Sequence, residues 1–384
     1  MKTLKDFDLK NKKVLLRVDI NSDVVKGKVI FSERVREAAK TIKFLKQKKA
    51  KIAVLAHQGN PEKEDFIDLK QHAKLLNKFT KVKFVDDVIG KKAVQAINQL
   101  KQGEAILLDN VRFIKDEFNP ENPENALIKN LTPLFDIYVN DAFSVCHRSQ
   151  TSIISFPKYL PSCAGLLLEK EISALEKISV KNCLYILGGA KPEENIKLLR
   201  GKKVLACGLF AQLCLVSIGK NLGYQNEFLK KATLVNEDYN SFLNKLKTKL
   251  ANVETPVDFA VDFKGKRKEF SLEQFPLNYE IEDIGEKTQK KYIEIIKKSG
   301  AIYMKGPAGN TSKKQFATGT RAILKAVAQC KGFTLIGGGH LSDAIEKFKI
   351  PKSKFGYVSL SGGALLSYIA GEKLPGLEVL GYYK

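Results

Sequence analysis

Residues 14–21 read VLLRVDIN, and this stretch decides the fold. A short apolar run leads directly into Arg17, Asp19 and Asn21, and a helical pattern begins at residue 34. A buried strand followed by an amphipathic helix is the unit from which parallel sheets are built. The polar residues that end the strand are therefore predicted to lie at the carboxyl edge of a sheet, where open α/β folds bind ligands.

The same alternation of strand and helix continues along the chain. Short apolar runs recur at 52–55, 105–108, 134–139, 184–187, 204–206, 257–261, 301–304, 333–336 and 357–359. Helical patterns lie between them, at 34–47, 69–76, 288–298 and 315–329. Repeated units of this kind predict an α/β protein with two Rossmann-like lobes, each a parallel sheet covered by helices.

The length of 384 residues, of which 44% are apolar, is enough for two domains with a core each. Residues 166–178, LLLEKEISALEKI, carry apolar residues at helical spacing and predict a helix that joins the lobes as a firm hinge. The predicted division is a first lobe at 1–160, the hinge at 161–180 and a second lobe at 181–370. Residues 262–285 are rich in charge and weak in pattern, so a surface excursion is predicted there.

The formal net charge of +23 has three explanations: a lysine-rich solvated surface, attraction of small acidic substrates, or nucleic-acid binding. The 42 acidic residues are interspersed among the basic ones, which favours the solvated surface, with substrate attraction as a second benefit. The aromatic residues are embedded in apolar patterns and indicate core packing rather than a base-stacking platform. No nucleic-acid partner is expected.

The cysteines and the N-terminal sequence indicate in which cellular compartment the protein is located. Six cysteines show no CxxC pair and lie mostly in apolar stretches, which indicates reduced, buried thiols rather than disulfides or a zinc site. The sequence has no run of about 18 apolar residues, and its start has no apolar segment of a secretory signal. A cytoplasmic protein without membrane association is predicted.

The strand ends of the two halves differ in kind. In the first half they carry fixed polar side chains: Arg17, Asp19, Asn21, His57, Asn110, Arg112, His147 and Arg148. In the second half they carry glycines: LGGAK at 187–191, KGPAG at 305–309, IGGGH at 336–340 and SGGA at 361–364. Fixed side chains suit a small, multiply charged substrate, and bare backbone N–H groups at a helix start suit a phosphate chain. This asymmetry predicts transfer of a phosphoryl group between two ligands.

Eight motifs in this order resemble the phosphoglycerate kinase family over essentially the whole chain: RVDIN, HQG, LDNVRF, VNDAFSVCHRSQTS, GGAK, GPAG, GGGH and GGALLSYIAGEKLPG. HQG, HRSQ and GGGH resemble its archaeal branch. The resemblance implies a hinge-bending monomer that moves the acyl phosphate of 1,3-bisphosphoglycerate to ADP, giving 3-phosphoglycerate and ATP with Mg²⁺. It also implies that residues 371–384 pack back onto the first lobe.

The strand-end positions and the resemblance together assign a phosphoglycerate site in the first lobe, made of Arg17, Asp19, Asn21, Arg34, His57, Arg112 and Arg148. His57, Arg112 and Arg148 are predicted to hold the phosphate, with bidentate geometry from the arginines. Arg17 is predicted to order this network with Asp19 as its partner. The resemblance gives Arg34 the catalytic role of stabilising the phosphoryl group in transit, whereas Arg36 faces elsewhere.

In the second lobe the predicted nucleotide site is Gly189, Lys191, Gly208, Lys305, Gly306, Pro307, Gly309, Ser312, Gly337, Gly338, Gly339 and His340. Lys191 is the expected phosphate ligand, and closure is expected to bring it and the helix start at Gly362 and Gly363 toward Arg34. These four residues form the predicted catalytic set. His340 stands where many relatives carry a magnesium-binding aspartate, so it is either a weak metal ligand or a helix cap. No metal ligand is assigned.

Four departures from the family pattern cluster in the second lobe. Ser312 replaces a glutamate that contacts the ribose, Lys305 replaces an asparagine, Asn195 replaces a second lysine, and SLSGG at 359–363 replaces STGGG. Loss of the ribose carboxylate should weaken nucleotide binding, and loss of a glycine at Ser361 should narrow the anion site. Lys305 could restore positive charge near the β- and γ-phosphates.

Two hypotheses follow from these residues. The favoured one is an active phosphoglycerate kinase of divergent archaeal type. The alternative is a non-catalytic phosphoglycerate-binding or regulatory protein whose nucleotide site has decayed, since the departures spare the first lobe.

Overall fold

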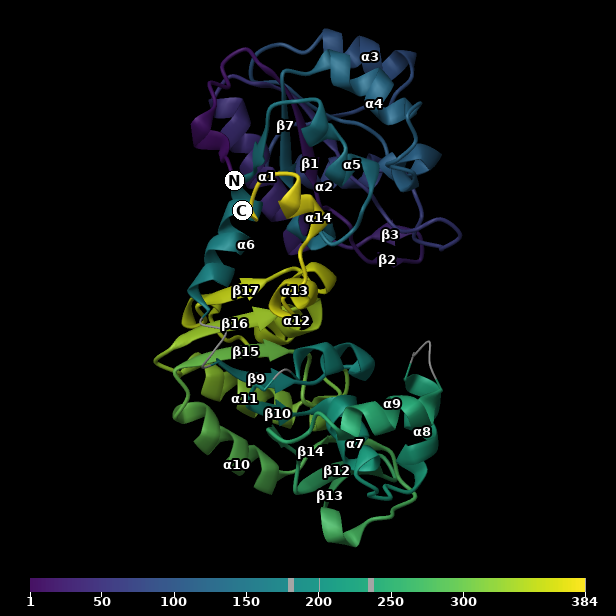
Figure 1. The fold of residues 1–384 in the computed structure, drawn as a ribbon, viewed down its shortest axis with the longest axis vertical. Coiled ribbons are helices and arrows are strands. Elements are labelled where there is room, and N and C mark those ends of the chain that lie inside the picture. The colour runs from purple at the N-terminus through teal and green to yellow at the C-terminus, as the bar shows by residue number, and fades with distance from the viewer. Residues whose placement is uncertain (179–182, 200, 234–237, 384) are drawn as a thin grey trace. The chain divides into compact units, whose positions relative to one another are not determined.

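The computed structural model describes residues 1–178, 183–199, 201–233 and 238–383. The chain forms two compact units (Figure 1). Unit 1 comprises Met1–Ser173 together with Gly363–Lys384, and unit 2 comprises Ala174–Gly362. Unit 2 is therefore inserted into the sequence of unit 1. The prediction of two α/β lobes, each with a parallel sheet, is confirmed.

Unit 1 is built on a parallel six-stranded sheet in the order β5-β6-β4-β1-β7-β8. Its strands are β1 (Lys13–Val18), β4 (Lys51–Leu55), β5 (Lys83–Phe84), β6 (Ala105–Leu107), β7 (Ile137–Asp141) and β8 (Ser162–Ala164), and β2 (Val24–Val25) and β3 (Lys28–Val29) form a separate hairpin. Its helices are α1 (Glu33–Gln47), α2 (Lys70–Leu76), α3 (Lys91–Asn98), α4 (Ala126–Leu131), α5 (Thr151–Ile154), α13 (Gly363–Ile369) and α14 (Pro375–Glu378). Helix α6 (Leu166–Lys177) contains the boundary at 173/174.

Both faces of this sheet are buried, which explains the uninterrupted apolar runs in the sequence. Val14 and Leu16 belong to a core cluster that includes Val35 and Ile42 of α1. Leu15, which points to the opposite face, belongs to a second cluster with residues of α3 and α4. All ladders of the sheet are parallel, so the carboxyl ends of its strands share one edge.

Unit 2 is built on a second parallel sheet in the order β11-β10-β9-β15-β16-β17. These strands are β9 (Cys183–Leu187), β10 (Val204–Ala206), β11 (Val253–Glu254), β15 (Ala301–Lys305), β16 (Phe333–Gly337) and β17 (Tyr357–Ser359). The helices are α7 (Gly208–Ser217), α8 (Tyr224–Ala232), α9 (Tyr239–Lys247), α10 (Glu286–Lys297), α11 (Thr318–Ala328) and α12 (Gly339–Lys347). The main core cluster joins the inner strands to α10, α11 and α12.

A small antiparallel sheet in unit 2 corrects two predictions. Strands β12 (Asp258–Phe263), β13 (Lys266–Ser271) and β14 (Ile281–Ile284) pair in the order β13-β12-β14. The run at 257–261 therefore lies outside the parallel sheet, and residues 262–285 are not an excursion. Strand β13 is largely solvent-exposed and carries KRKEFS, so its hydrophobic pattern is weak. Lys264 and Gly265, both with positive φ, make the tight turn that joins β12 to β13.

The described residues contain no helix that is both long and apolar enough to cross a membrane. All six cysteines are free thiols, and five of them are buried.

Candidate active site

At the carboxyl edge of the unit 1 sheet, Arg17 is fully buried at the end of β1. Its Nε donates to the Ser152 hydroxyl at 2.8 Å, and that hydroxyl donates to the buried carboxylate of Glu117 at 2.8 Å. Its other contacts are the Val18 carbonyl and, at 3.1 Å, Nδ1 of His57. The prediction that Arg17 pairs with Asp19 is wrong, because its guanidinium group points toward Ser152 of α5 and toward His57. Arg17 thus connects Ser152 and His57 through buried hydrogen bonds.

The contact with Arg17 determines the state of His57. A guanidinium can only donate, so Nδ1 of the ring accepts and the proton resides on Nε2. Burial lowers the pKa of His57 well below its usual value, and the positive charge of Arg17 lowers it further. His57 is therefore a neutral donor through Nε2–H, rather than a cation.

Asp19 links Arg34 to the same edge. Its carboxylate lies 3.4 Å from Arg34 Nη1 and accepts hydrogen bonds from the Ser144 hydroxyl and from the backbone N–H of Asn21. Burial by itself raises the pKa of Asp19, but Arg34 and these hydrogen bonds outweigh it and hold the pKa below its usual value. Arg34 is the second residue of α1 and also donates to the Asn21 carbonyl at 3.2 Å.

Asn21 and Arg36 complete this part of unit 1. The Asn21 side-chain oxygen accepts from the Gly59 N–H at 2.8 Å, so the side chain ties the end of β1 to the loop after β4. Arg36 pairs with Glu33 at 2.7 Å and lies over the rings of Phe31 and Phe79, away from Asp19.

Arg112 and Arg148 make the edge strongly positive. Arg112 is buried, donates to the Gly59 carbonyl and to Asn60 Oδ1 (2.8 Å), and its Nε has no partner among the described residues. Burial lowers the pKa of Arg112 to about 10, with further contributions from Arg17 and Arg148. Such lowering by like charges marks an excess of positive charge that a bound anion would relieve.

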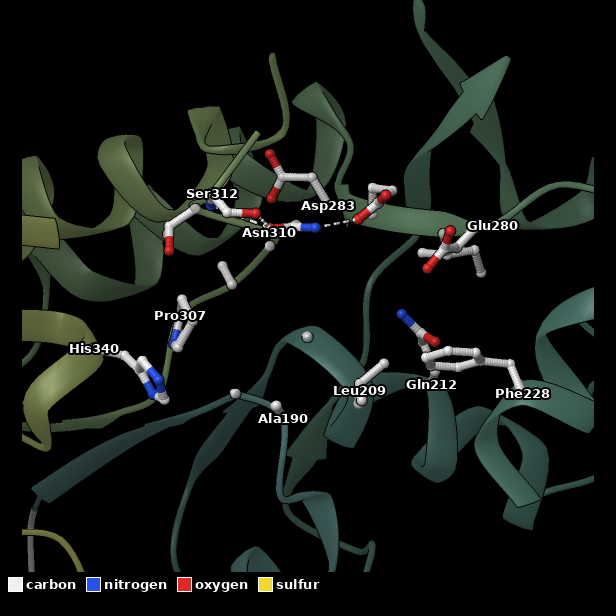
Figure 2. Close-up of a pocket in the computed structure, with 17 residues that line it drawn as sticks. Ala190, Leu209, Gln212, Phe228, Glu280, Asp283, Pro307, Asn310, Ser312 and His340 are labelled. Atoms are coloured by element: carbon white, nitrogen blue, oxygen red, sulfur yellow. Dashed lines mark hydrogen bonds between the residues drawn. The ribbon is translucent and has the colours of Figure 1, made fainter. Parts of the chain in front are cut away.

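Unit 2 contains a cavity of about 390 Å³ at the carboxyl ends of β9, β10 and β15 (Figure 2). Six of the residues predicted to bind nucleotide line it: Gly189, Gly208, Pro307, Gly309, Ser312 and His340. The other six do not: Lys191, Lys305, Gly306, Gly337, Gly338 and Gly339. The lining also contains residues that the sequence motifs did not indicate, chiefly Leu209, Gln212, Phe228, Glu280, Glu282, Asp283 and Asn310.

The glycines beside the cavity serve mainly to bring loops together. The N–H of Gly189 donates to the Pro307 carbonyl at 2.9 Å, and the N–H of Gly208 donates to the Ala308 carbonyl at 3.1 Å. Gly306 has a φ of +74°, and a Cβ there would lie 2.5 Å from the Gly188 carbonyl. These residues therefore shape the cavity, and the N–H groups of Gly189 and Gly208 are already used within the protein.

The backbone of the IGGGH motif is more open. Gly337 ends β16, Gly338 is the N-cap of α12 with a φ of +100°, and Gly339 begins the helix. No atom lies within 4 Å of a Cβ placed on Gly338 or Gly339, so this helix start can accept a close ligand. His340 is the second residue of α12, and of its two alternatives the role of helix cap is excluded because Gly338 occupies that position.

Two lysines near β9 share one carboxylate. Lys305 is mostly buried and its Nζ contacts Glu194 at 2.9 Å and the side-chain oxygen of Asn195 at 3.1 Å. Lys191 is mostly exposed and lies 3.8 Å from the other oxygen of Glu194. The charge of Lys305 is thus compensated by Glu194, whereas the side chain of Lys191 is mostly exposed and lies farther from that carboxylate.

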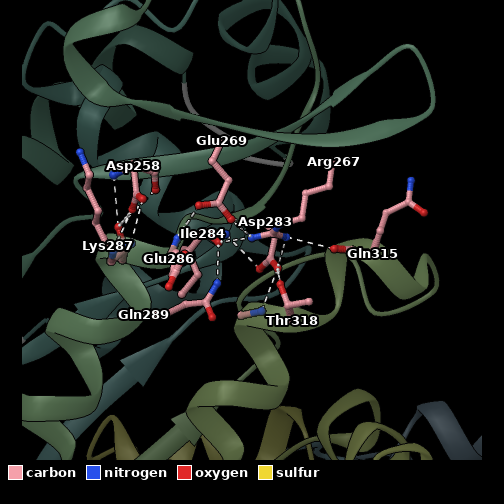
Figure 3. Close-up of polar contacts among 12 residues, drawn as sticks. Asp258, Arg267, Glu269, Asp283, Ile284, Glu286, Lys287, Gln289, Gln315 and Thr318 are labelled. Carbon is pink, nitrogen blue, oxygen red and sulfur yellow. Dashed lines mark hydrogen bonds and ion pairs between the residues drawn. The ribbon is translucent and has the colours of Figure 1, made fainter.

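Two of the three carboxylates that line the cavity, Glu282 and Asp283, are also paired. The Ser312 hydroxyl donates to Asn310, and Asn310 donates to Glu282 at 2.9 Å, while Lys313 forms an ion pair with Glu282. Asp283 is held by Arg267 at 2.8 Å, by the Thr318 hydroxyl and by the N–H of Gly319, the second residue of α11 (Figure 3). Burial raises the pKa of Asp283 to about 6 despite these partners.

Comparison with known proteins decides the family. The family model described as phosphoglycerate kinase matches residues 4–372. The chain belongs to the phosphoglycerate kinase family. Curated phosphoglycerate kinases of Sulfolobus acidocaldarius and Methanothermus fervidus are 40% and 38% identical to it, and each alignment covers 98% of this chain and at least 95% of the relative.

Solved structures agree with this assignment. The crystal structure of phosphoglycerate kinase from Pyrococcus horikoshii matches with a TM-score of 0.90 and 36% identity, covering 100% of this chain and 99% of that one. The structure from Coxiella burnetii matches with a TM-score of 0.80 and 31% identity, covering 99% and 98%. The predicted family and its archaeal affinity are confirmed, and the chain is a phosphotransferase. Nothing in these matches supports the non-catalytic alternative.

A resident metal does not fit the side chains of this kinase. No group of three potential ligands from His, Cys, Asp and Glu occurs among the described residues. In the cavity, Glu282 is paired with Lys313 and Asp283 with Arg267. We therefore assign no metal ligand.

Gly363 has a second role beside its place at the start of α13. A Cβ on Gly363 would lie 3.0 Å from Nε2 of His147, so a larger residue at this helix start would require the ring to shift by a few tenths of an ångström. Gly362 has no neighbour within 4 Å of a Cβ and is the last residue of unit 2.

Proposed function

We propose that this chain reversibly transfers the acyl phosphate of 1,3-bisphosphoglycerate to ADP, giving 3-phosphoglycerate and ATP. The observation that carries the proposal is the uncompensated positive charge at the edge of unit 1. Arg17, Arg34, Arg112 and Arg148 share this edge with two buried carboxylates, Asp19 and Glu117. A multiply charged anion is the ligand that this arrangement favours.

The residues of the unit 1 site have three proposed roles: binding the phosphate, positioning His57 and stabilising the transferred phosphoryl group. Arg112 and Arg148 bind the phosphate of phosphoglycerate through their guanidinium groups, and neutral His57 donates through Nε2–H. Arg17 positions His57, since three of its five N–H groups donate to Ser152, Val18 and His57. Asp19 holds Arg34, which stabilises the negative charge of the phosphoryl group as it moves.

Unit 2 binds the nucleotide. The apolar cavity holds the base and ribose, and the open helix start at Gly338 and Gly339 receives the phosphates. Lys191, whose side chain is 71% exposed and whose Nζ lies 3.8 Å from Glu194, is the proposed phosphate ligand. Mg²⁺ would come as part of the substrate, because magnesium in such sites is held chiefly by nucleotide phosphates and water.

Because each ligand is bound by its own unit, transfer requires the units to close on one another and exclude water. Helix α6 contains the first unit boundary and is the proposed hinge. The chain passes from unit 2 back to unit 1 between Gly362 and Gly363. Glycine has wide backbone freedom, so two consecutive glycines suit a second hinge point. We propose a monomer that acts in the cytoplasm, in keeping with six free thiols.

Replacement of Arg34 tests the proposal. In Arg34→Ala we expect turnover to fall at least about 1,000-fold, since an arginine that stabilises phosphoryl-transfer charge contributes effects of that size. Binding of 3-phosphoglycerate and of MgADP, measured by calorimetry, should change little. Arg36→Ala, two residues along the same helix, is the matched control and should keep full turnover. Unchanged turnover in Arg34→Ala would remove this residue from the mechanism.

A further inference from the structure

Gln212 is out of place in its own helix. Helix α7 reads GLFAQLCLVS, and its buried residues are otherwise apolar except for a serine at its end. Gln212 is only 3% exposed. Burying an amide among apolar side chains costs free energy unless its donor and acceptor find partners. A glutamine here therefore needs a reason that packing does not supply.

The amide of Gln212 has no such partner among the residues that the structure describes. Its Oε1 is buried and accepts no hydrogen bond from any described residue. The side chain lines the unit 2 cavity and extends into it from α7, as Figure 2 shows. The ring of Phe228, from α8, lines the same cavity. The cavity thus offers an aromatic face and one uncommitted amide.

Four other polar side chains of the cavity, Asp283, Asn310, Ser312 and Glu280, are occupied or have a different character. Asp283 is bound by Arg267 and Thr318, and Asn310 bridges Ser312 and Glu282. The carboxylate of Glu280 can only accept hydrogen bonds when ionised. Among these groups, Gln212 is the one that offers a donor and an acceptor side by side.

We infer that Gln212 reads the base of the bound nucleotide and selects a 6-aminopurine, adenine, over guanine. This inference rests on the proposed function, which places a nucleotide in the cavity. The amide oxygen accepts from the 6-amino group and the amide nitrogen donates to the adjoining ring nitrogen, as glutamine does when it recognises adenine elsewhere. The Phe228 ring supplies a face against which a base can stack.

Adenine is favoured because of the pattern on its edges. It presents a donor beside an acceptor on both sides of the 6-position, so a single amide can pair with it in two placements. Guanine presents two acceptors on its N7 side and offers a matching pair only on the other side. An amide whose oxygen faces the 6-position accepts from the 6-amino group of adenine but meets the oxygen acceptor of guanine, so an amide fixed in that orientation discriminates between the two bases.

The test compares nucleotides and variants by calorimetry with MgADP and MgGDP. The wild type should bind MgADP more tightly than MgGDP. Gln212→Leu, which keeps the volume and removes both hydrogen-bonding groups, should weaken MgADP binding by roughly 10-fold or more and leave MgGDP within about twofold. Gln329→Leu, at the exposed end of α11 and outside the cavity, is the matched control and should bind as the wild type does.

Gln212→Glu provides a second, isosteric variant should the leucine disturb folding. Its carboxylate accepts but cannot donate, so it should lose affinity for MgADP and gain relative affinity for MgGDP, whose N1–H and 2-amino groups are donors. A shift of preference toward guanine in this variant supports base reading by residue 212.

The outcomes separate the two proposals. If the wild type binds neither nucleotide, the proposed function is wrong and this inference falls with it. If the wild type binds MgADP and both variants bind it equally well, the proposed function stands and base reading by Gln212 is overturned. Equal weakening of both nucleotides in both variants would assign Gln212 to the shape of the cavity and would also overturn the inference.

Discussion

The two units solve the problem of binding a phosphorylated ligand in opposite ways. The edge of unit 1 is made of charged side chains fixed by one another, such as Arg17 on Ser152 and Asp19 on Arg34. The corresponding edge of unit 2 is made of backbone, with glycine loops in close contact and two of its carboxylates, Glu282 and Asp283, already paired. The site in unit 1 depends on an excess of positive charge, and the site in unit 2 depends on the shape of its backbone loops. Removal of a charge should therefore affect unit 1 most, and addition of a methyl group to a glycine should affect unit 2 most.

The contrast extends to one buried aspartate in each unit. Asp141, at the end of β7, accepts the N–H groups of Leu167 and Leu168 at the start of α6, and its second oxygen has no partner among the described residues. Asp283 likewise accepts an N–H at the start of α11, but it has Arg267 beside it. Burial raises the pKa of Asp141 to about 7 and that of Asp283 to about 6.

The largest effect should come from adding a methyl group to the backbone site. Gly306→Ala would place a Cβ 2.5 Å from the Gly188 carbonyl at a φ of +74°. We expect a loss of about 4 kcal/mol in the free energy of unfolding of unit 2, from steric collision and backbone strain together. Urea denaturation measures this loss.

The control for that substitution is Gly219→Ala. Gly219 has a φ of +88°, but no atom lies within 4 Å of its Cβ position. It should cost only the strain of the left-handed conformation, about 1 kcal/mol. Equal losses in the two variants would show that loop contact does not require glycine at 306, and the contrast between the units would weaken.

The next effect concerns Asp141 and pH. Its pKa of about 7 in the folded protein lies above the usual value of 3.8, so the folded state binds the proton more tightly. The stability that this group contributes is therefore full below pH 4 and is lost as the pH rises to about 7. Asp141→Asn keeps an oxygen for Leu167 and Leu168 and cannot ionise.

We expect the variant to gain about 4 kcal/mol relative to the wild type between pH 4 and pH 8, because the pKa is raised from 3.8 to about 7 and each pKa unit corresponds to about 1.4 kcal/mol. Denaturation of both proteins at several pH values provides the measurement. A difference that does not vary with pH would show that the carboxyl is ionised throughout and that its burial is better compensated than the contacts indicate.

The smallest effect tests the excess of charge in unit 1. Arg148→Ala should weaken 3-phosphoglycerate by about 2 kcal/mol, which is roughly 30-fold, and leave MgADP unchanged. The ligand-free protein should keep its stability or gain a little, because Arg148 repels Arg112 and lowers its pKa. Calorimetry and thermal melting check both points. A clear loss of stability without ligand would show that Arg148 is structural.

Much of the fold could be predicted because both faces of each parallel sheet are buried. The apolar runs reveal the strands, but they misplace strand ends. The apolar pattern suggested a strand at 134–139, whereas β7 runs from Ile137 to Asp141, since Asn140 and Asp141 are buried polar residues that continue the ladder. Strand β13 was missed because its charged side chains hide the period of two.

The sequence predicts which residue types form the site, but it does not predict which hydrogen-bond partner each side chain has in the folded protein. Strand-end logic finds Arg112 and Arg148 but cannot tell that Arg17 binds Ser152 instead of Asp19. It identifies glycine loops but not whether Gly306 faces a ligand or Gly188. Gln212 could have been noticed as the lone amide in an apolar helix, but its position in a cavity wall depends on the packing of α7 against β14 and α8.

The insertion of unit 2 within unit 1 has a consequence for synthesis. Unit 1 is completed by residues 363–384, where the N–H of Gly376 bonds the Cys146 carbonyl at 2.9 Å and the terminal amine of Met1 bonds the Gly381 carbonyl at 3.3 Å. A ribosome therefore releases every residue of unit 2 before it releases the last part of unit 1. The usual order of co-translational folding is N-terminal domain first, whereas in this chain all of unit 2 is available to fold before the sequence of unit 1 is complete.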